Sequence, residues 1–287
     1  MGSFTYRTGV KFILSLIGIF LIGSLPALFN GVHLDFGSYF SQLTAIIPDI
    51  VRPWEWTYTI EGISRSLFPK ILDPWAYSMT LLFGSFFIAF LAAIVFAYVT
   101  LLLPRKLIDG TKFILFSLES LPDVLVIAIF QIAVIWMYQK TGILMFYIAE
   151  YGDHQPYTLP IIALSILPTI FMYRIFILDL EEESEQPYVE LAKAKGLKHY
   201  AVLLKHILRN AIMGIFLHSK FILWIMLSNL LVVEYIFAIS GLIQFMISLP
   251  TPQIFTIGII LLFVPIFIIM SIGQFIIEKV AVQKVVL

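Results

Sequence analysis

The fold is decided by an uncharged stretch, residues 74–104, which reads PWAYSMTLLFGSFFIAFLAAIVFAYVTLLLP. A second uncharged stretch covers residues 235–277. Apolar runs of 18 or more residues indicate helices that span a lipid bilayer. The whole chain of 287 residues is 60% hydrophobic and only 13% charged, whereas about a quarter of the residues in a soluble globular domain are charged. A soluble protein with a large core is therefore excluded, and we expect an all-α polytopic membrane protein.

The hydropathy pattern of the whole chain predicts about six spans. They lie near residues 10–30, 76–103, 112–138, 158–178, 211–235 and 254–277. The first run follows Arg7 and Lys11 and has the beginnings of a signal peptide, but it lacks a clear small-residue cleavage site, so we interpret it as a retained helix. Lysine and arginine gather on the side that would hold both termini, which predicts that both are cytoplasmic.

The amino-acid composition argues against a nucleic-acid partner and against sites that depend on cysteine. The formal net charge is zero, which predicts no nucleic-acid partner. The chain has no cysteine, so disulfides and thiolate metal sites are excluded. His154 beside Asp153 has the chemistry of a metal ligand or a pH sensor, but a lone exposed histidine is usually neither, and we predict no metal site.

Two segments between the spans have distinct characters. Residues 31–75 are predicted to be extracytoplasmic, with aromatic side chains suited to the headgroup level and a small cap of short helices. Residues 236–253 are apolar but contain Ser240-Gly241 and Pro250-Thr251-Pro252, which break helices. Apolar backbone that is not helical must be buried in protein or line a cavity, so we expect a short re-entrant segment there.

The long cytoplasmic loop, residues 179–210, carries the most specific signal. Ser184 is suited to cap a helix that tolerates Pro187 in its first turn, and Gly196 is suited to end that helix. A second helix is expected from about His199 to Asn210. Two short helices bent at a glycine would form a compact projection, small enough around its alanines for a partner to approach. The alternative is a solvated linker of amphipathic helices.

The residues of this loop carry a resemblance. Gln186-Pro-Tyr-Val-Glu-Leu-Ala-Lys-Ala-Lys-Gly-Leu197, followed by His206-Ile-Leu-Arg-Asn-Ala211, resembles the EAA loop of ABC importer permeases, and more narrowly that of the peptide/nickel permease family. Glu119-Ser-Leu-Pro-Asp123 and Val232-Val-Glu-Tyr-Ile-Phe237 are similar to further family segments, whereas Gly214 replaces a usual proline. The resemblance implies a type I importer permease fold, with one transmembrane domain over 1–287. It implies an ATPase-coupling role within 186–211 for Tyr188, Glu190, Ala192, Ala194, Lys195, Gly196, His206, Arg209 and Asn210.

The same resemblance implies the partners. The chain has no G-x-x-x-x-G-K-[ST] phosphate loop, so it should be a transport subunit that holds no cofactor, with ATP and Mg²⁺ on partner chains. Those partners would be two ABC ATPase subunits, a second homologous permease subunit and an extracytoplasmic substrate-binding protein, in a bacterial cytoplasmic membrane. The solute would be a dipeptide or oligopeptide, the family's majority substrate, with nickel or another small solute as alternatives.

Polar residues inside the spans are the remaining candidates. Charge at membrane depth tends to face a cavity or a partner. Glu119 and Asp123, one turn apart on the third predicted span, and Glu234 on the fifth are candidates to line the pathway, although pairing with other groups or a structural role would also account for them. Gln131, Asn229 and Gln244 are candidates for interhelical hydrogen bonds.

Other classes of function predict other features. An ion-coupled secondary transporter would be expected to show half-repeats with broken helices, and we find no convincing repeat. A membrane-embedded enzyme would be expected to cluster its histidines and acids, but the five histidines are scattered. A scaffold without transport activity remains an alternative at this stage.

Overall fold

The computed structural model describes residues 2–285 apart from 31–32, 53–55, 61, 145, 151 and 153. Within this described part, six helices are long and apolar enough to cross a membrane. They occupy Phe4–Leu28, Leu72–Leu101, Asp123–Thr141, Thr158–Ser184, His218–Ile236 and Pro252–Ile277. The predicted polytopic helical fold is therefore confirmed. The chain divides into two compact units, residues 1–79 with 240–287 and residues 80–239, which are described separately.

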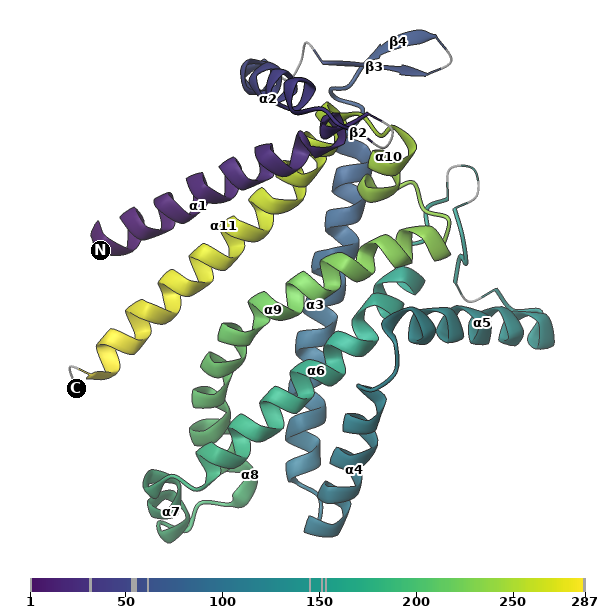
Figure 1. The fold of residues 1–287 in the computed structure, drawn as a ribbon. Helices are drawn as coiled ribbons and strands as arrows, with labels where there is room; N and C mark the ends of the chain where they lie inside the picture. The colour runs from purple at the N-terminus through teal and green to yellow at the C-terminus, as the bar shows by residue number, and fades with distance from the viewer. Residues whose placement is uncertain are drawn as a thin grey trace. The chain divides into compact units, whose positions relative to one another are not determined.

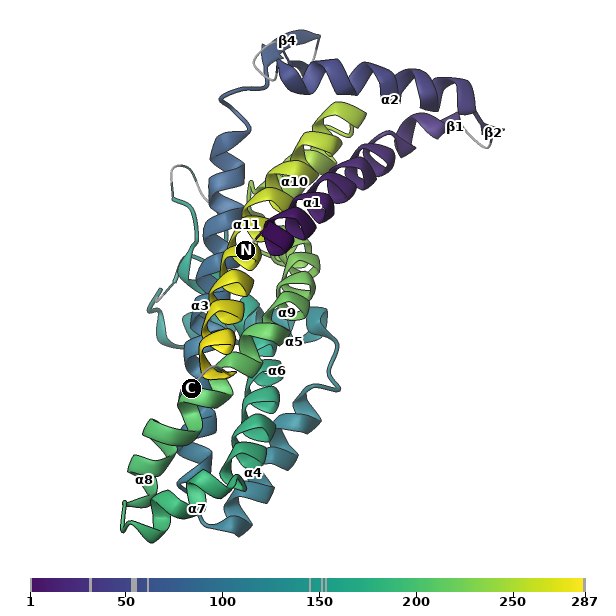
Figure 2. The same cartoon turned by 90° about the vertical axis from the view of Figure 1, so that its left-hand side faces the viewer.

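The first unit is built on an antiparallel pair of helices, α1 (Gly2–Gly23) and α11 (Pro252–Val285). Their rings meet in reverse sequence order, Phe4 with Phe275 at 5.6 Å and Phe12 with Phe267 at 5.2 Å between centroids. Gly23 packs directly against Thr256, where no side chain would fit. The two helices lie side by side with the N- and C-terminal ends together (Figures 1 and 2). This is the arrangement expected if both termini lie on one side of the membrane.

The segment between α1 and α3 (Leu72–Leu101) differs from the predicted cap of short helices. It contains a 3-10 turn, η1 (Leu25–Leu28), and one long helix, α2 (Phe36–Val51), but also two pairs of antiparallel strands. Strands β1 (Phe29–Asn30) and β2 (His33–Leu34) form one pair, and β3 (Thr57–Ile60) and β4 (Ile63–Ser66) form the other. The β-branched residues of 57–66 favour strands, and this local signal agrees with the observed pair.

Asp35 caps α2. Its carboxylate accepts hydrogen bonds from the Ser38 backbone N–H at 3.0 Å and from the Ser38 hydroxyl at 2.6 Å. These bonds stabilise the charged form and lower the pKa of Asp35 below its usual value.

The expected interruption before the last span is a short helix, α10 (Leu242–Ser248). Its first N–H, from Leu242, donates to the Ser78 hydroxyl at 2.8 Å, and Gly258 of α11 lies against Met246. Further along α11, the carbonyl of Leu261 accepts a hydrogen bond from Trp75 Nε1 at 2.8 Å. The break therefore packs inside protein, as the polar backbone of a membrane segment requires.

The second unit centres on two helices, α6 (Thr158–Ser184) and α9 (Leu208–Ile236), which pack along each other. The remainder of α3 lies against α6, where the Ser85 hydroxyl donates to the Ile161 carbonyl at 3.0 Å and Gly84 lets the Ile161 side chain approach. Tyr173 and Phe176 of α6 are fully buried. This core positions the loop that follows α6.

Two helices precede the core pair, α4 (Arg105–Leu118) and α5 (Asp123–Thr141). The single span predicted for 112–138 is therefore wrong. Pro122 is extended, with φ −60° and ψ 134°, and the helix stops before it and begins again after it. Of these two helices, α5 has the length and hydropathy of a span and α4 does not.

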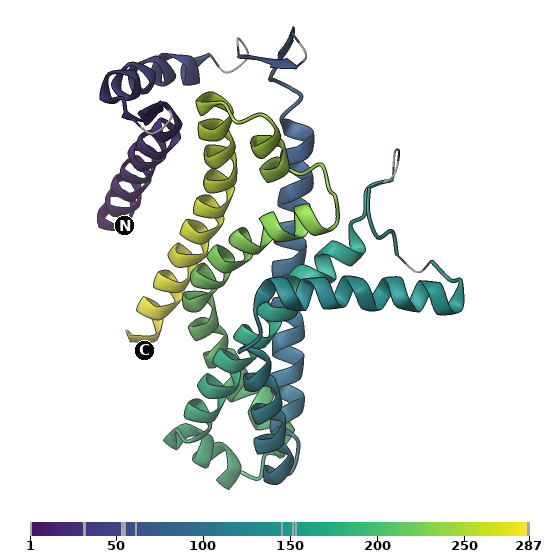
Figure 3. The same cartoon turned by 45° about the vertical axis from the view of Figure 1, so that its right-hand side comes forward.

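The loop between the core helices contains α7 (Pro187–Ala194), α8 (His199–Val202) and a π-helical turn, η3 (Leu203–Ile207). The second loop helix was predicted to end near Asn210, but η3 runs directly into α9. Within this unit, α7 and α8 lie at the end where α3 finishes and α4 begins (Figures 1 and 3).

Candidate functional site

The loop begins differently from the prediction at Ser184. Its hydroxyl donates to the Glu181 carbonyl at 2.8 Å, within the last turn of α6, so Ser184 does not cap the next helix. Gln186, extended at φ −71° and ψ 144°, is the residue before α7, and Pro187 is the first helical residue. Proline suits that position because its missing N–H has no partner there in any case. The acidic residues 181–183 therefore end α6 rather than begin α7.

Gly196 ends α7, as predicted. It adopts φ +79°, and its N–H donates to the Lys193 carbonyl at 2.9 Å. The next N–H, from Leu197, donates to the Ala192 carbonyl at 3.4 Å. These two bonds make a Schellman motif, the usual way in which a glycine in the left-handed conformation closes a helix. The loop consequently turns sharply at one fixed position.

A small apolar core holds the two halves of the loop together. Val189 and Ala192 of α7 are buried, as are Val202 and residues Leu203 and Ile207 of the π-helical turn. The η3 turn packs against α6. Tyr188 adds a hydrogen bond from its hydroxyl to the Glu183 carboxylate. These contacts join the loop to the end of α6.

Outside this core the loop presents an apolar and basic surface, which we call the loop surface. Leu191 is 57% exposed, and it is joined by Ala194, Lys195, Leu197 (44%), Tyr200 (51%) and Leu204 (48%). Several large apolar side chains exposed on one short loop are typical of an interaction site.

The predicted coupling residues divide between core and surface. Glu190, Ala194, Lys195 and Gly196 are exposed, whereas Ala192 is 5% exposed and packs within its own chain. The expectation that Ala192 opens space directly for a partner does not fit its position. The backbone of His206 lies in η3 and that of Arg209 and Asn210 in α9, and their side chains lie outside the described part of the structure.

The pathway candidates Glu119 and Asp123 do not lie one turn apart on one helix, as predicted. Glu119 ends α4 and Asp123 begins α5, on opposite sides of the break at Pro122. Glu119 Oε2 accepts a hydrogen bond from Arg174 Nη1 of α6 at 2.6 Å, and Asp123 accepts one from the Asn229 amide of α9. Both acids therefore join their segment to the two core helices.

Other polar residues of the spans have structural positions. Gln131 donates to the Ile236 carbonyl at 3.1 Å, so the interhelical bonds predicted for Gln131 and Asn229 are confirmed. Glu234 is fully buried in α9. A role for these residues in lining a pathway stays a prediction.

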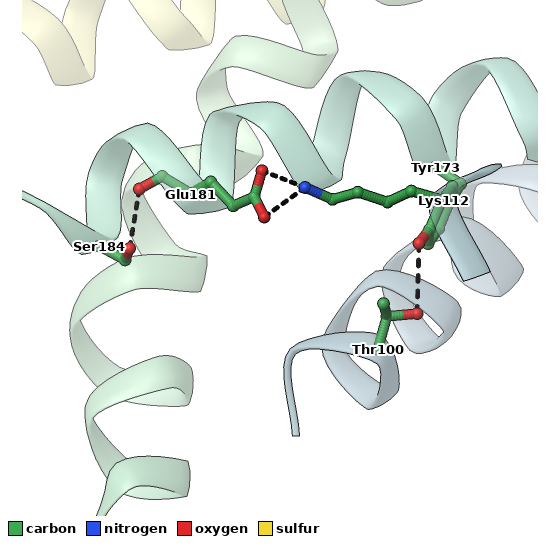
Figure 4. A network of polar contacts seen from close by, with 5 residues as sticks. All are labelled: Thr100, Lys112, Tyr173, Glu181 and Ser184. Atoms are coloured by element: carbon green, nitrogen blue, oxygen red, sulfur yellow. Dashed lines mark hydrogen bonds and ion pairs between the residues drawn. The ribbon is translucent and has the colours of Figure 1, made fainter. Parts of the chain in front are cut away.

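An ion pair that was not predicted from the sequence lies at the C-terminal end of α6. Lys112 of α4 reaches both carboxylate oxygens of Glu181, and Tyr173 donates from its hydroxyl to Thr100 of α3 at 3.3 Å (Figure 4). In the sequence, Lys112 stands out only as one of the lysines and arginines on the side predicted to be cytoplasmic. Its spacing of seven residues from Glu119 was the available signal, because residues seven apart share a helix face.

No metal centre is found among the described residues, where no three histidines or acids come together. The His154 ring stacks on Tyr147 at 5.1 Å between centroids, and Asp153 lies outside the described residues.

Residues 89–281, more than half of the chain, match the protein family described as the binding-protein-dependent transport system inner membrane component. The chain belongs to this family. A solved structure of the MetNI methionine ABC transporter in inward-facing conformations has a chain of similar fold, with a TM-score of 0.53 at 18% identity, covering 73% of this chain and 94% of that one. The predicted fold of a type I ABC importer permease is thereby confirmed.

Curated relatives match over shorter stretches. A putative peptide transport system permease protein of Brucella abortus is 27% identical over 119 residues, 42% of this chain and 38% of the relative. The dipeptide transport system permease protein DppB of Bacillus subtilis is 33% identical over 90 residues, 31% of this chain and 29% of the relative. The putrescine export system permease protein SapB of Escherichia coli is 30% identical over 90 residues, 31% of this chain and 28% of the relative. The match thus spans well under half of each relative.

Proposed function

We propose that the chain is a permease subunit of an ATP-driven importer and that the loop surface binds a separate ATPase subunit. The observation that carries this proposal is a loop with its own buried core, closed at Gly196 and packed onto α6, whose outer side exposes Leu191, Leu197 and Tyr200. The family match and the fold support a place in such a transporter.

The mechanism follows from the attachment of the loop to α6 and α9. Movement of a partner bound at the loop surface would shift both helices together, since the loop is continuous with each. Such a shift transmits ATP binding to the membrane only if the two arrangements of the interface bind nucleotide differently. We place the loop and both termini on the cytoplasmic side, in line with the distribution of lysine and arginine.

The other components of the proposal are a second permease subunit, two ATPase chains that hold ATP and Mg²⁺, and an extracytoplasmic binding protein. We propose a dipeptide or oligopeptide as the solute, because relatives from Brucella and Bacillus carry peptide and dipeptide transport in their names. The chain itself would contribute helices to the pathway and no catalytic group.

The test is purification and uptake with a matched pair of variants. Leu191→Glu puts a charge on the loop surface, and Leu144→Glu makes the same change at a leucine of similar exposure, 51%, outside the loop. The complex should be purified through a tagged permease with its co-expressed ATPase, and dipeptide uptake measured in vesicles. Leu191→Glu is expected to remove the ATPase and the uptake, and Leu144→Glu to keep both.

Two results would overturn the proposal. One is co-purification of the ATPase with Leu191→Glu at the level of the unchanged protein. The other is uptake that continues without ATP and stops when an ion gradient is collapsed, because that behaviour belongs to a secondary transporter.

A further inference from the structure

Two ion pairs join α4 to α6, and their positions are related. Lys112 of α4 pairs with Glu181 of α6, and Glu119 at the end of α4 pairs with Arg174 of α6. The partners are seven residues apart on each helix, from 112 to 119 and from 174 to 181, and run in opposite directions. Seven residues are two helical turns, so the two pairs lie about 10 Å apart along one shared face. We call these two pairs the ion-pair ladder.

The ladder specifies one register of the two helices. Each helix carries one positive and one negative residue at these positions, in an order that gives opposite charges only in the observed alignment. Sliding α4 by two turns in one direction would bring Glu119 beside Glu181, and in the other direction Lys112 beside Arg174. Like charges in these places are unfavourable, and all the more so where the surroundings hold little water.

One side chain of each pair is largely covered by the protein. The side chains of Lys112 and Glu119 are 18% and 10% exposed, whereas those of their partners Glu181 and Arg174 are 37% and 52% exposed. Because one partner is covered, water screens each pair less than it screens a fully exposed pair. The Arg174 guanidinium, 52% exposed, also lies over the Phe116 ring at 5.3 Å, on the stretch of α4 between the two pairs. The apolar ring and the charges therefore hold the same face of α4 on α6.

The segment that carries the ladder is also bonded to the other core helix. After the break at Pro122, Asp123 of α5 accepts a hydrogen bond from Asn229 of α9. The residues from 112 to 123 thus contact both helices that flank the loop, α6 through the ladder and α9 through Asn229. At the C-terminal end of α6, Glu181 stands five residues before Gln186, the residue that precedes α7. Figure 4 shows Glu181 there between Lys112 and Ser184.

We infer that Lys112, Glu119, Arg174 and Glu181 are positioning residues that make residues 112–123 follow the movement of the loop. This inference rests on the proposed function, because it assigns the segment that receives the force delivered at the loop surface. In this arrangement the ladder keeps α4 in register with α6, and the α4–α5 break converts their joint shift into a change in α5.

The experiment is a charge exchange in the full transporter. Lys112→Glu and Glu181→Lys each place like charges together, whereas the double exchange restores an opposite pair. Glu182→Lys is the matched control, because it makes the same charge change at an exposed neighbour in the same turn. The complex is reconstituted in vesicles with its ATPase and binding protein, and ATP hydrolysis and uptake of labelled dialanine are measured together.

We expect each single exchange to raise the ATP hydrolysed per dialanine taken up by about tenfold or more, the double exchange to return within about twofold of the unchanged protein, and Glu182→Lys to have no effect. A merely structural role would lower hydrolysis and uptake in proportion and leave their ratio unchanged. An unchanged ratio in both single variants, or a double exchange as impaired as either one, would overturn the inference.

A second measurement separates this result from the fate of the proposed function. Melting of the purified full chain in detergent requires no partner, and the single exchanges should melt lower than the double exchange. If that order holds but uptake by the unchanged complex does not depend on ATP, the proposed function fails and the force-transmitting role fails with it. If the melting order is absent, the ladder itself is refuted.

Discussion

Substitutions at Gly196 test whether the closed turn at the end of α7 is needed. The residue has φ +79°, and a Cβ placed there would meet no atom within 4 Å, so the cost of a side chain is that of the backbone conformation alone. For alanine that cost is about 1–2 kcal/mol. Asparagine tolerates this conformation better and should cost less. Proline cannot adopt it, and it also removes the N–H that donates to Lys193.

Limited proteolysis converts these costs into rates. Lys193 lies in the last turn of α7, and trypsin can cut the peptide bond after it only when that turn opens. Where opening is fast compared with cleavage, the rate follows the population of the open form. A cost of 1–2 kcal/mol corresponds to a population change of about 5- to 30-fold. Cleavage after Lys193 should therefore rise by that factor in Gly196→Ala, by less in Gly196→Asn, and to the rate of an unfolded loop in Gly196→Pro.

The matched control is Gly110→Ala. Gly110 is an exposed glycine inside α4 with ordinary helical geometry and no atom within 4 Å of an added Cβ. The change should leave cleavage after Lys193 as it is and strengthen α4 slightly. In the assembled transporter, Gly196→Pro should also lose the ATPase or hydrolyse ATP without uptake. Equal cleavage of the unchanged protein and the alanine and proline variants would refute the role of the turn.

Three further perturbations have defined outcomes. Gly23→Ala should lower the melting temperature more than Gly258→Ala. At position 23 an added Cβ would lie 2.0 Å from Oγ1 of Thr256, a stiff, branched side chain, whereas at position 258 it would lie 2.3 Å from the sulfur of the flexible Met246. Gly9→Ala, where no atom lies within 4 Å of an added Cβ, should leave the melting temperature unchanged. Asn229→Ala should lower the free energy of unfolding by about 1–3 kcal/mol in a denaturant titration, because the Asp123 carboxylate loses the hydrogen bond that the Asn229 amide donates. Ser228→Ala, at a more exposed neighbouring residue, should lower it by less. Ser38→Ala should raise the pKa of Asp35 towards its usual value in an NMR titration, because the hydrogen bond from the Ser38 hydroxyl contributes most to lowering that pKa. Since the pKa of Asp35 is lower in the folded chain than in the unfolded chain, the cap stabilises α2 fully at a pH above the ordinary pKa of an aspartate. This stabilisation is lost as the pH falls through the lowered pKa.

The spans and the loop were predictable because their signals are local. An uncharged run such as 74–104 has one stable form in lipid, a helix, and the structure places α3 over nearly the same residues, Leu72–Leu101. Gly196 and Pro187 restrict the backbone on their own, whatever surrounds them, so the limits of α7 follow from two residues. The helix α7 thus follows the general rule that proline is common at the start of a helix and glycine just after its end.

The errors have a common cause, which is competition between equally plausible local choices. Ser184 has the side chain of a cap, but α6 continues through it because its hydroxyl bonds back to Glu181. The span predicted for 112–138 is apolar enough to cross the membrane, yet Pro122 forces an extended residue and the helix restarts at Asp123. In each case the outcome depends on which partner the surrounding fold supplies, and the hydropathy pattern holds no information about that partner.

The ladder illustrates the limit most clearly. The spacing of Lys112 and Glu119 places them on one face of a helix, and the spacing of Arg174 and Glu181 does the same. Many pairs of helices satisfy such a condition, so the spacing alone does not say which faces meet. What the structure adds is the antiparallel alignment of α4 and α6, in which both pairs form at once. Two matched charges seven residues apart on each partner are a stronger restraint than one pair. A shift that would break a single contact must here break both, and a shift of two turns would oppose like charges.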